Sequence, residues 1–72
     1  MESIVKVQRN HNGKIISFET NTGRIISYQK ALAEAEDGII SNVEIQGDSD
    51  GFSFLSHTDS EDPGFNLFPP IY

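Results

Sequence analysis

The feature that most constrains this fold is an Asn-Gly pair at residues 12 and 13, which separates two runs of alternating apolar residues. Asn-Gly between such runs is the strongest short-range signal for a β-hairpin and predicts a two-residue turn. The resulting register gathers apolar side chains on one face and sets opposite charges against each other on the other face, which favours cross-strand pairing. The predicted pairs are Val7 with Phe18, Lys6 with Glu19, Gln8 with Ser17, Arg9 with Ile16, and Val5 with Thr20.

A second turn signal is Asn21-Thr22-Gly23. A three-residue loop, with Gly23 in the left-handed conformation, brings Phe18 opposite Ile26. A two-residue loop would instead place Ser27 opposite Phe18 and break the apolar face. The alternation therefore predicts a three-stranded antiparallel meander, with an inner face of Val5, Val7, Ile16, Phe18 and Ile26.

Helix signals follow the third predicted strand. Ser27 is a candidate N-cap, residues 28–37 are rich in good helix formers, and Gly38 suits a left-handed stop. The apolar stripe is narrow and includes small residues, which predicts close packing against the sheet. Its members are Tyr28, Ala31, Leu32 and Ala35, with Ile39 just beyond.

Alternation returns after Ile40 and predicts a second hairpin. Opposing Ile45 to Phe52, and Val43 to Phe54, keeps the apolar side chains together around a four-residue loop at 47–50. The element order is then β-β-β-α-β-β, an α+β fold whose helix packs on one face of a sheet. We expect residues 1–56 to form a single small domain.

Residues 57–72 begin as an acidic loop and end in an apolar segment. Such an ending is unusual for a free terminus, so we expect it to pack back on the domain or to contact a partner. Pro69-Pro70-Ile71-Tyr72 matches the PPxY pattern of WW-domain ligands, although docking on the domain itself is the more economical interpretation. The candidate partner-binding residues are Phe65, Leu67, Phe68, Ile71 and Tyr72.

Charge divides the chain into two parts. The formal net charge is −6, yet all five basic residues fall in the first thirty positions, which carry +3. The other forty-two residues carry −9, so the chain can orient a partner or neutralise itself. A nucleic-acid site is the alternative of a different class, but the predicted register does not align the basic side chains in one stripe. Its residues would be Lys6, Arg9, Lys14 and Arg24.

Two sequence patterns suggest a metal or catalytic site. Residues 48–51, Asp-Ser-Asp-Gly, resemble the start of a calcium loop, but Ser53 and Asp59 stand where an EF-hand needs glycine and glutamate. His11 has no local partner, and His57 has only the loop acids Asp59 and Glu61 nearby. We therefore expect no metal, cofactor or catalytic site, and we expect that the protein is not an enzyme.

Aromatic residues could instead form a platform on which nucleic-acid bases stack. In the predicted register these rings share faces with core positions, and the nearby charge is negative, so we assign them to the core. They are Phe18, Tyr28, Phe52 and Phe54.

The absence of cysteine fits a reducing compartment, and the N-terminus shows no signal-peptide pattern. No apolar run is long enough to span a membrane. These observations predict a cytoplasmic protein of one small domain.

Several segments form a recognisable pattern: Ile4-Val5-Lys6-Val7, the Asn12-Gly13 turn, Gly23 to Ser27, Ala31 to Ile40 with Val43, and Asn66-Leu67-Phe68-Pro69. This pattern resembles a family of short bacterial proteins of unknown function. Its members resemble one another in an N-terminal strand pair, a serine-capped short helix closed by a Gly-Ile step, and a C-terminal motif of Asn-Leu and proline. It implies a bacterial cytoplasmic setting and supplies no catalytic residues.

These inferences together predict a non-enzymatic module for protein–protein interaction. Its expected partner is another protein or a second copy of itself, without nucleic acid or membrane. The alternatives are a nucleic-acid-binding module that uses the basic hairpins and a homodimeric structural protein.

Overall fold

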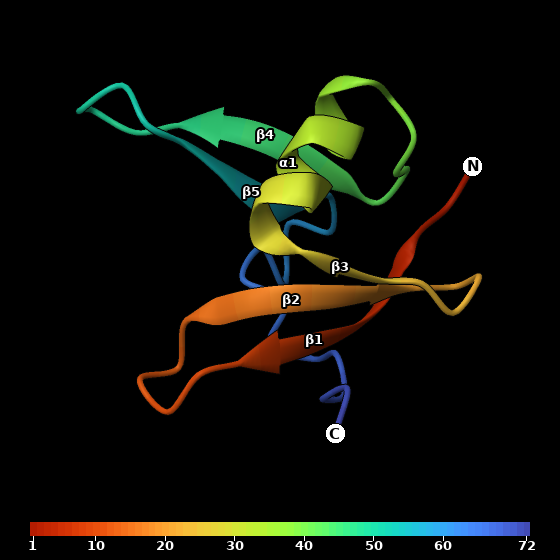
Figure 1. The fold of residues 1–72 in the computed structure, drawn as a ribbon. Coiled ribbons are helices and arrows are strands. Elements are labelled where there is room, and N and C mark those ends of the chain that lie inside the picture. The colour runs from red at the N-terminus through yellow and green to blue at the C-terminus, as the bar shows by residue number, and fades with distance from the viewer.

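The computed structural model describes residues 1–72 as an α+β fold with two antiparallel sheets and one helix (Figure 1). A three-stranded sheet has the order β1-β2-β3, and β4 pairs with β5 in a separate two-stranded sheet. The predicted order β-β-β-α-β-β is confirmed. The elements are β1 (Ile4–Arg9), β2 (Ile15–Thr20), β3 (Ile25–Ser27), α1 (Tyr28–Glu36), β4 (Val43–Gly47) and β5 (Ser53–His57).

The first hairpin has the predicted register at its centre only. Val7 lies opposite Phe18, Lys6 opposite Glu19 and Gln8 opposite Ser17, as predicted, but an irregularity interrupts the ladder on each side. The predicted outer pairs are therefore wrong: Thr20 faces Ile4 instead of Val5, and Arg9 faces Ile15 instead of Ile16. Each bulge changes the side of the sheet that the following residues occupy.

The bulges also change the inner face of the meander. Val7, Phe18 and Ile26 are buried as predicted, and Phe18 lies opposite Ile26. Val5 and Ile16 were expected on this face and are instead 36% and 44% exposed. Ile4 and Ile15, their chain neighbours, point inward in their place.

All three hairpin turns share one geometry, a three-residue loop that ends in a left-handed glycine. The glycines are Gly13, Gly23 and Gly51, with φ values of 83°, 89° and 85°. The prediction for the second turn is confirmed, because the Thr20 N–H donates to the Arg24 carbonyl oxygen at 2.9 Å. The two-residue turn predicted at 12–13 is wrong: Asn10 pairs with Lys14, and the Asn10 side-chain oxygen accepts from the N–H of Asn12 and Lys14.

The second hairpin departs from prediction in both loop and register. The Asp48 side-chain oxygen accepts hydrogen bonds from the N–H groups of Asp50 and Phe52, which fixes a three-residue loop in place of the expected four-residue loop at 47–50. The ladder then sets Ile45 opposite Leu55 and Val43 opposite His57. Two predicted core rings are consequently outside: Phe52 is 70% exposed and Phe54 is 42% exposed.

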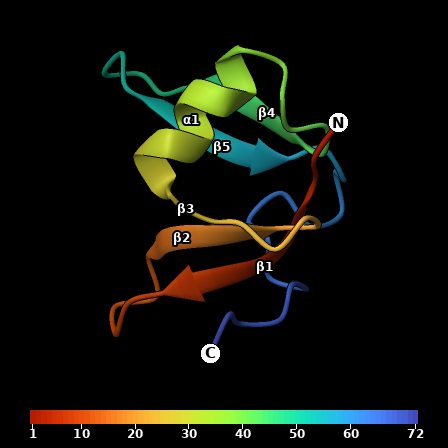
Figure 2. The same cartoon turned by 45° about the vertical axis from the view of Figure 1, so that its right-hand side comes forward.

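The helix begins and ends close to its predicted limits. The Ser27 hydroxyl caps it by accepting from the Lys30 N–H at 3.2 Å, and Gly38 follows the last turn with a φ of 74°. Ala31 is completely buried, which lets α1 lie close to its neighbours. Both views show α1 beside the two sheets, with its first turn next to β3 (Figure 2).

The two sheets share one hydrophobic core. No strand links them, and the N-terminal segment ties them together instead: Glu2 forms a bridge with Ile40, and the Asn42 side chain both accepts from and donates to the backbone of Ile4. The chain contains no helix with the length and apolar character needed to cross a membrane. The core residues are Ile4, Val7, Phe18, Ile26, Ala31, Ile40, Val43, Leu55 and Phe65.

Candidate functional site

The structure divides the five C-terminal residues that the sequence marks as candidate contacts. Phe65 is only 1% exposed and belongs to the core, with its ring centroid 5.4 Å from that of Phe18. Phe68 and Ile71 are half-buried. Leu67 and Tyr72 are 79% and 87% exposed, so only these two offer most of their side chain to a partner.

The C-terminal segment lies along the outer edge of β1. The Val7 N–H donates to the Pro69 carbonyl oxygen at 3.1 Å, and the Ile71 N–H donates to the Val7 carbonyl oxygen at 3.3 Å. Arg9 also reaches this segment and donates to the Gly64 carbonyl oxygen at 2.8 Å. The segment therefore covers a strand edge that would otherwise be open.

Neither histidine side chain takes part in a hydrogen bond or an ion pair within the chain. His11 is exposed in the first turn. His57 ends β5, and its ring packs on Phe65 and Phe68, with centroid separations of 5.4 Å and 4.8 Å. The loop acids Asp59 and Glu61 are its neighbours in sequence, but in the fold the chain after β5 turns back and packs Phe65 and Phe68 on the ring.

The acidic turn at 48–51 satisfies its own hydrogen bonds. Asp48 uses a side-chain oxygen to hold two backbone N–H groups of the loop, as an Asx turn does. No cluster of three or more potential metal-ligating side chains occurs in the structure.

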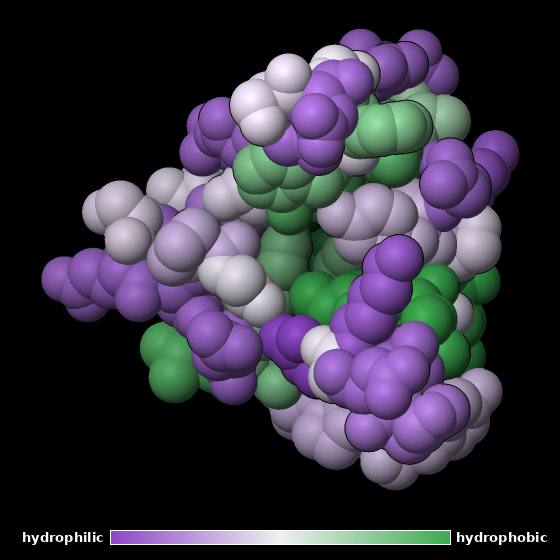
Figure 3. All heavy atoms as spheres, turned by 90° about the vertical axis from the view of Figure 1, so that its left-hand side faces the viewer, coloured by the Kyte–Doolittle hydropathy of each residue, from purple (hydrophilic) through white to green (hydrophobic).

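The largest hollow lies between the two hairpins and is named here the interhairpin groove. It holds about 460 Å³ and is open to solvent. Figure 3 shows apolar side chains recessed between the polar side chains of the two hairpins. Its lining comes from Lys14 and the start of β2, the end of β3, the first half of α1 and the start of β5, namely Lys14, Ile15, Ile16, Ser27, Tyr28, Gln29, Leu32, Ser53 and Phe54.

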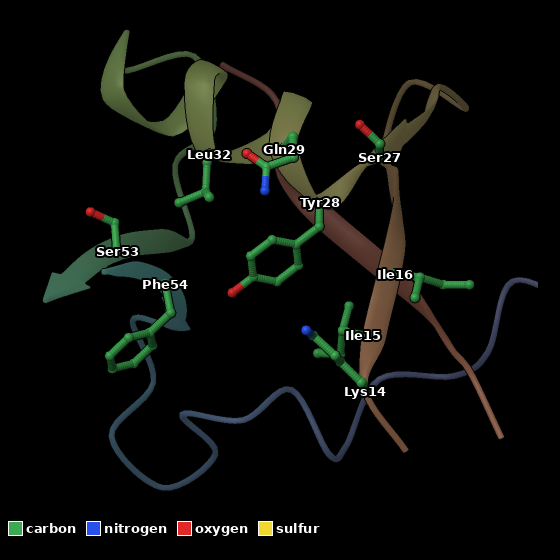
Figure 4. Close-up of a pocket in the computed structure, with 9 residues that line it drawn as sticks. All are labelled: Lys14, Ile15, Ile16, Ser27, Tyr28, Gln29, Leu32, Ser53 and Phe54. Atoms are coloured by element: carbon green, nitrogen blue, oxygen red, sulfur yellow. The ribbon is translucent and has the colours of Figure 1, made fainter. Parts of the chain in front are cut away.

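Tyr28 is the central side chain of this groove. Its ring packs against Phe18 at a centroid separation of 5.7 Å, and its hydroxyl points between β2 and β5 (Figure 4). The hydroxyl oxygen accepts a hydrogen bond from the Leu55 N–H at 2.8 Å, so its own proton is free to donate. The groove thus combines an apolar wall with one polar anchor.

The strand edge of β5 forms the second wall of the groove. Hydrogen bonds between Asp48 and Phe52 and between Asn42 and Thr58 bracket the β4–β5 ladder. By the two-residue period, Ser53 and Leu55 turn their backbone groups away from β4. The Leu55 N–H is taken by Tyr28, whereas both backbone groups of Ser53 and the Leu55 carbonyl oxygen have no hydrogen-bond partner in the chain. This edge is short and regular, and three of the four outward backbone groups of Ser53 and Leu55 are unpaired.

The guanidinium group of Arg24 is paired with two carboxylates within the fold. Arg24 forms ion pairs with Glu2 at 2.7 Å and with the buried Glu34 at 2.6 Å. Hydrogen bonds from Arg24 and then Thr22 lower the pKa of Glu2 from its ordinary 4.5 to about 2. Hydrogen bonds to the carboxylates of Glu34 and Glu2 in turn raise the pKa of Arg24. Lys14 is the one basic side chain that lines the groove.

The sequence did not predict the interhairpin groove. Its lining depends on Phe54, which we assigned to the core, and on Ile16, which we assigned to the inner face. Tyr28 was expected in the helix stripe, which gave no reason for its hydroxyl to meet β5. The one available signal was the placement of a tyrosine, with its polar end, at the first position of an otherwise small-residue stripe.

Fold and site together define a small α+β protein with an open strand edge beside an apolar groove. The chain belongs to the family described as "Protein of unknown function (DUF3892)", which matches residues 3–68. It is 43% identical over 44 residues to the "Uncharacterized protein YwsA" of Bacillus subtilis (strain 168). That match covers 61% of this chain and 45% of the relative, so the chain spans less than half of that protein. No solved structure matches.

Proposed function

We propose that this chain is a non-enzymatic protein-interaction module of the bacterial cytoplasm, and that it binds an extended segment of another protein in the interhairpin groove. The cytoplasmic setting is proposed because a cysteine-free chain suits a reducing compartment. The observation that carries the proposal is the open edge of β5 beside the apolar wall of the groove.

Strand addition uses both features at once. A bound segment would pair its backbone with Ser53 and with the Leu55 carbonyl oxygen, which supplies affinity independent of sequence. Its alternate side chains would enter the groove and contact Tyr28 and Leu32. The free proton of the Tyr28 hydroxyl adds one directional contact.

The charge of the chain favours a cationic segment with apolar residues at alternate positions. The net charge is −6, and residues 31–72 contain no lysine or arginine. Long-range attraction would therefore raise the association rate of a basic segment, most strongly at low salt. The occupied guanidinium groups of Arg9 and Arg24 favour this partner over nucleic acid, which needs free cations for its phosphates.

The test begins with selection of displayed random peptides on the full chain, followed by affinity measurements with the selected peptides made synthetically. The decisive variant is S53P, because proline removes the outward N–H and leaves the β4–β5 ladder intact. S53A is its matched control, since it keeps the N–H and removes only the exposed hydroxyl. We expect S53P to weaken binding about tenfold or more and S53A to change it less than about twofold.

Amide chemical shifts of the unmutated chain provide a second measurement that does not depend on how the variant folds. The proposal predicts that peptide addition moves the resonances of Ser53, Leu55 and Tyr28. Equal binding to S53P and S53A, shifts confined to another surface, or a selection that yields no binding peptide would each overturn it.

A further inference from the structure

The outer edge of β4 is a second open strand edge, on the opposite side of the same hairpin from the interhairpin groove. Glu44 and Gln46 are the residues of β4 whose backbone groups form hydrogen bonds with β5. The backbone groups of Val43, Ile45 and Gly47 therefore turn outward. No backbone or side-chain hydrogen bond in the chain reaches the backbone of these three residues.

The other edges of the fold carry protection that β4 lacks. The edge of β1 is covered by the C-terminal segment, including Pro69 and Pro70, and β1 itself is bulged. The edge of β5 is partly occupied by Tyr28, and β3 has only three residues. By contrast, β4 has no lysine, proline or register shift along its five residues. Natural proteins rarely leave such an edge unpaired.

We propose that β4 pairs with β4 of a second copy of this chain, antiparallel about a twofold axis at Ile45. Val43 would then lie opposite the partner's Gly47, and Glu44 would lie opposite the partner's Gln46. The two hairpins would form one continuous four-stranded sheet in the order β5-β4-β4-β5.

Charge selects this register. Only shifts of two positions keep the outward backbone groups facing each other. A shift in one direction places Glu44 opposite the partner's Glu44, and a shift in the other direction places it opposite the partner's Asp48. Like charges directly opposite are destabilising, whereas a glutamate opposite a glutamine amide accepts a hydrogen bond.

The same pattern favours a second copy over an unrelated protein. The glutamate–glutamine pair occurs twice in the symmetric arrangement, since each chain supplies one member to each pair. The absence of a side chain at Gly47 leaves space opposite the partner's Val43, and nothing lies within 4 Å of the position its Cβ would occupy. The β5 edge remains free in this dimer, so the inference does not depend on the proposed function.

Sedimentation equilibrium of the full chain tests the dimer, and Q46E tests its register. In Q46E two carboxylates oppose each other in both halves of the interface, so we expect the dimer dissociation constant to rise about tenfold at low salt. The double variant E44Q/Q46E exchanges the two side chains and should restore the original dissociation constant. N12D makes the same amide-to-carboxylate change in the exposed first turn, away from both hairpin edges of this sheet, and should leave it unchanged.

Three outcomes would overturn the proposal. One is a monomer throughout the concentration range, and another is a dimer whose affinity responds equally to Q46E and N12D. The third is failure of E44Q/Q46E to recover the dimer although its amide spectrum shows a folded chain. Recovery in the double variant would support both the contact and its register, because only this alignment places position 44 of each chain opposite position 46 of the other.

Discussion

Arg24 joins three parts of the chain through one guanidinium group. It donates to both oxygens of Glu2, which lies 22 residues earlier, and to both oxygens of Glu34, which lies ten residues later. The planar fork of arginine suits such paired carboxylate contacts, which a lysine cannot reproduce. The cluster therefore fixes the N-terminal segment against α1.

The lowered pKa of Glu2 predicts an acid-dependent loss of stability. Because the folded-state pKa is about 2 and the ordinary value is 4.5, the ionised carboxylate stabilises the fold above about pH 4.5. This contribution is lost as the pH falls from about 4.5 toward 2. We expect E2Q to be less stable than the unmutated chain at pH 7 and the difference to shrink across that interval.

Urea unfolding at a series of pH values from 7 to 2 measures this difference. R24K provides a second variant, since it keeps a positive charge but loses the paired hydrogen bonds, and it should also flatten the acid dependence. A difference between E2Q and the unmutated chain that stays constant down to pH 2 would contradict the assigned role of Glu2.

At the scale of single elements, local signals predict most of the secondary structure. Ser27 as cap, Gly38 as stop and the turn at 21–23 all depend on interactions within a few residues, and each is confirmed. Bulges do not depend on local sequence alone, because an extra residue is tolerated only where packing compensates for it. The prediction therefore placed Val5 and Ile16 on the inner face of the sheet, whereas both are exposed, although it gave the central pairs correctly.

The register of the second hairpin explains why the sequence analysis did not predict the interhairpin groove. Apolar alternation alone cannot distinguish Phe52 and Phe54 from Leu55 as the partners of β4. The choice is made by the Asp48 loop and by the Tyr28 hydroxyl, which meets β5 from 27 residues away. Contacts over that separation require the fold to be known, so the lining of the groove follows from tertiary structure.

The shared turn geometry makes a prediction about glycine. Alanine at Gly13, Gly23 or Gly51 must adopt a positive φ, which costs roughly 1–2 kcal/mol for a residue with a Cβ. Gly64 has no positive φ, and an added Cβ there would meet only the Asn66 side chain at 3.5 Å, so G64A is the matched control and should cost less stability. Chemical unfolding of the four variants compares their free energies. The shared geometry would be contradicted if the turn variants lost no more stability than G64A.

At the scale of the whole molecule, the last sixteen residues contribute a side chain to the hydrophobic core and also cover the open edge of β1. Phe65 fills the space between the sheets, and Asp62 holds the turn that positions it by accepting from the N–H groups of Asn66 and Leu67 at 2.8 Å. The sequence indicated an apolar segment that packs back or contacts a partner, but not which residues do which. The division follows from the turn at 62–65, where Phe65 itself has a positive φ of 60°.

This division predicts that the two halves of the segment differ in their effect when changed. A chain that ends at Phe68 keeps Phe65 and should remain folded, but it loses the hydrogen bonds that join Val7 to residues 69 and 71. Hydrogen exchange at the Val7 amide should then accelerate, while the Phe18 amide inside the meander should keep its protection. F65A should instead destabilise the whole fold by about 3–5 kcal/mol, because it leaves a large cavity between the sheets.

An unchanged exchange rate at Val7 in the shortened chain would show that the C-terminal residues do not cover the β1 edge in solution. Global unfolding of that chain would show that the boundary between core and cover lies further toward the C-terminus than Phe68.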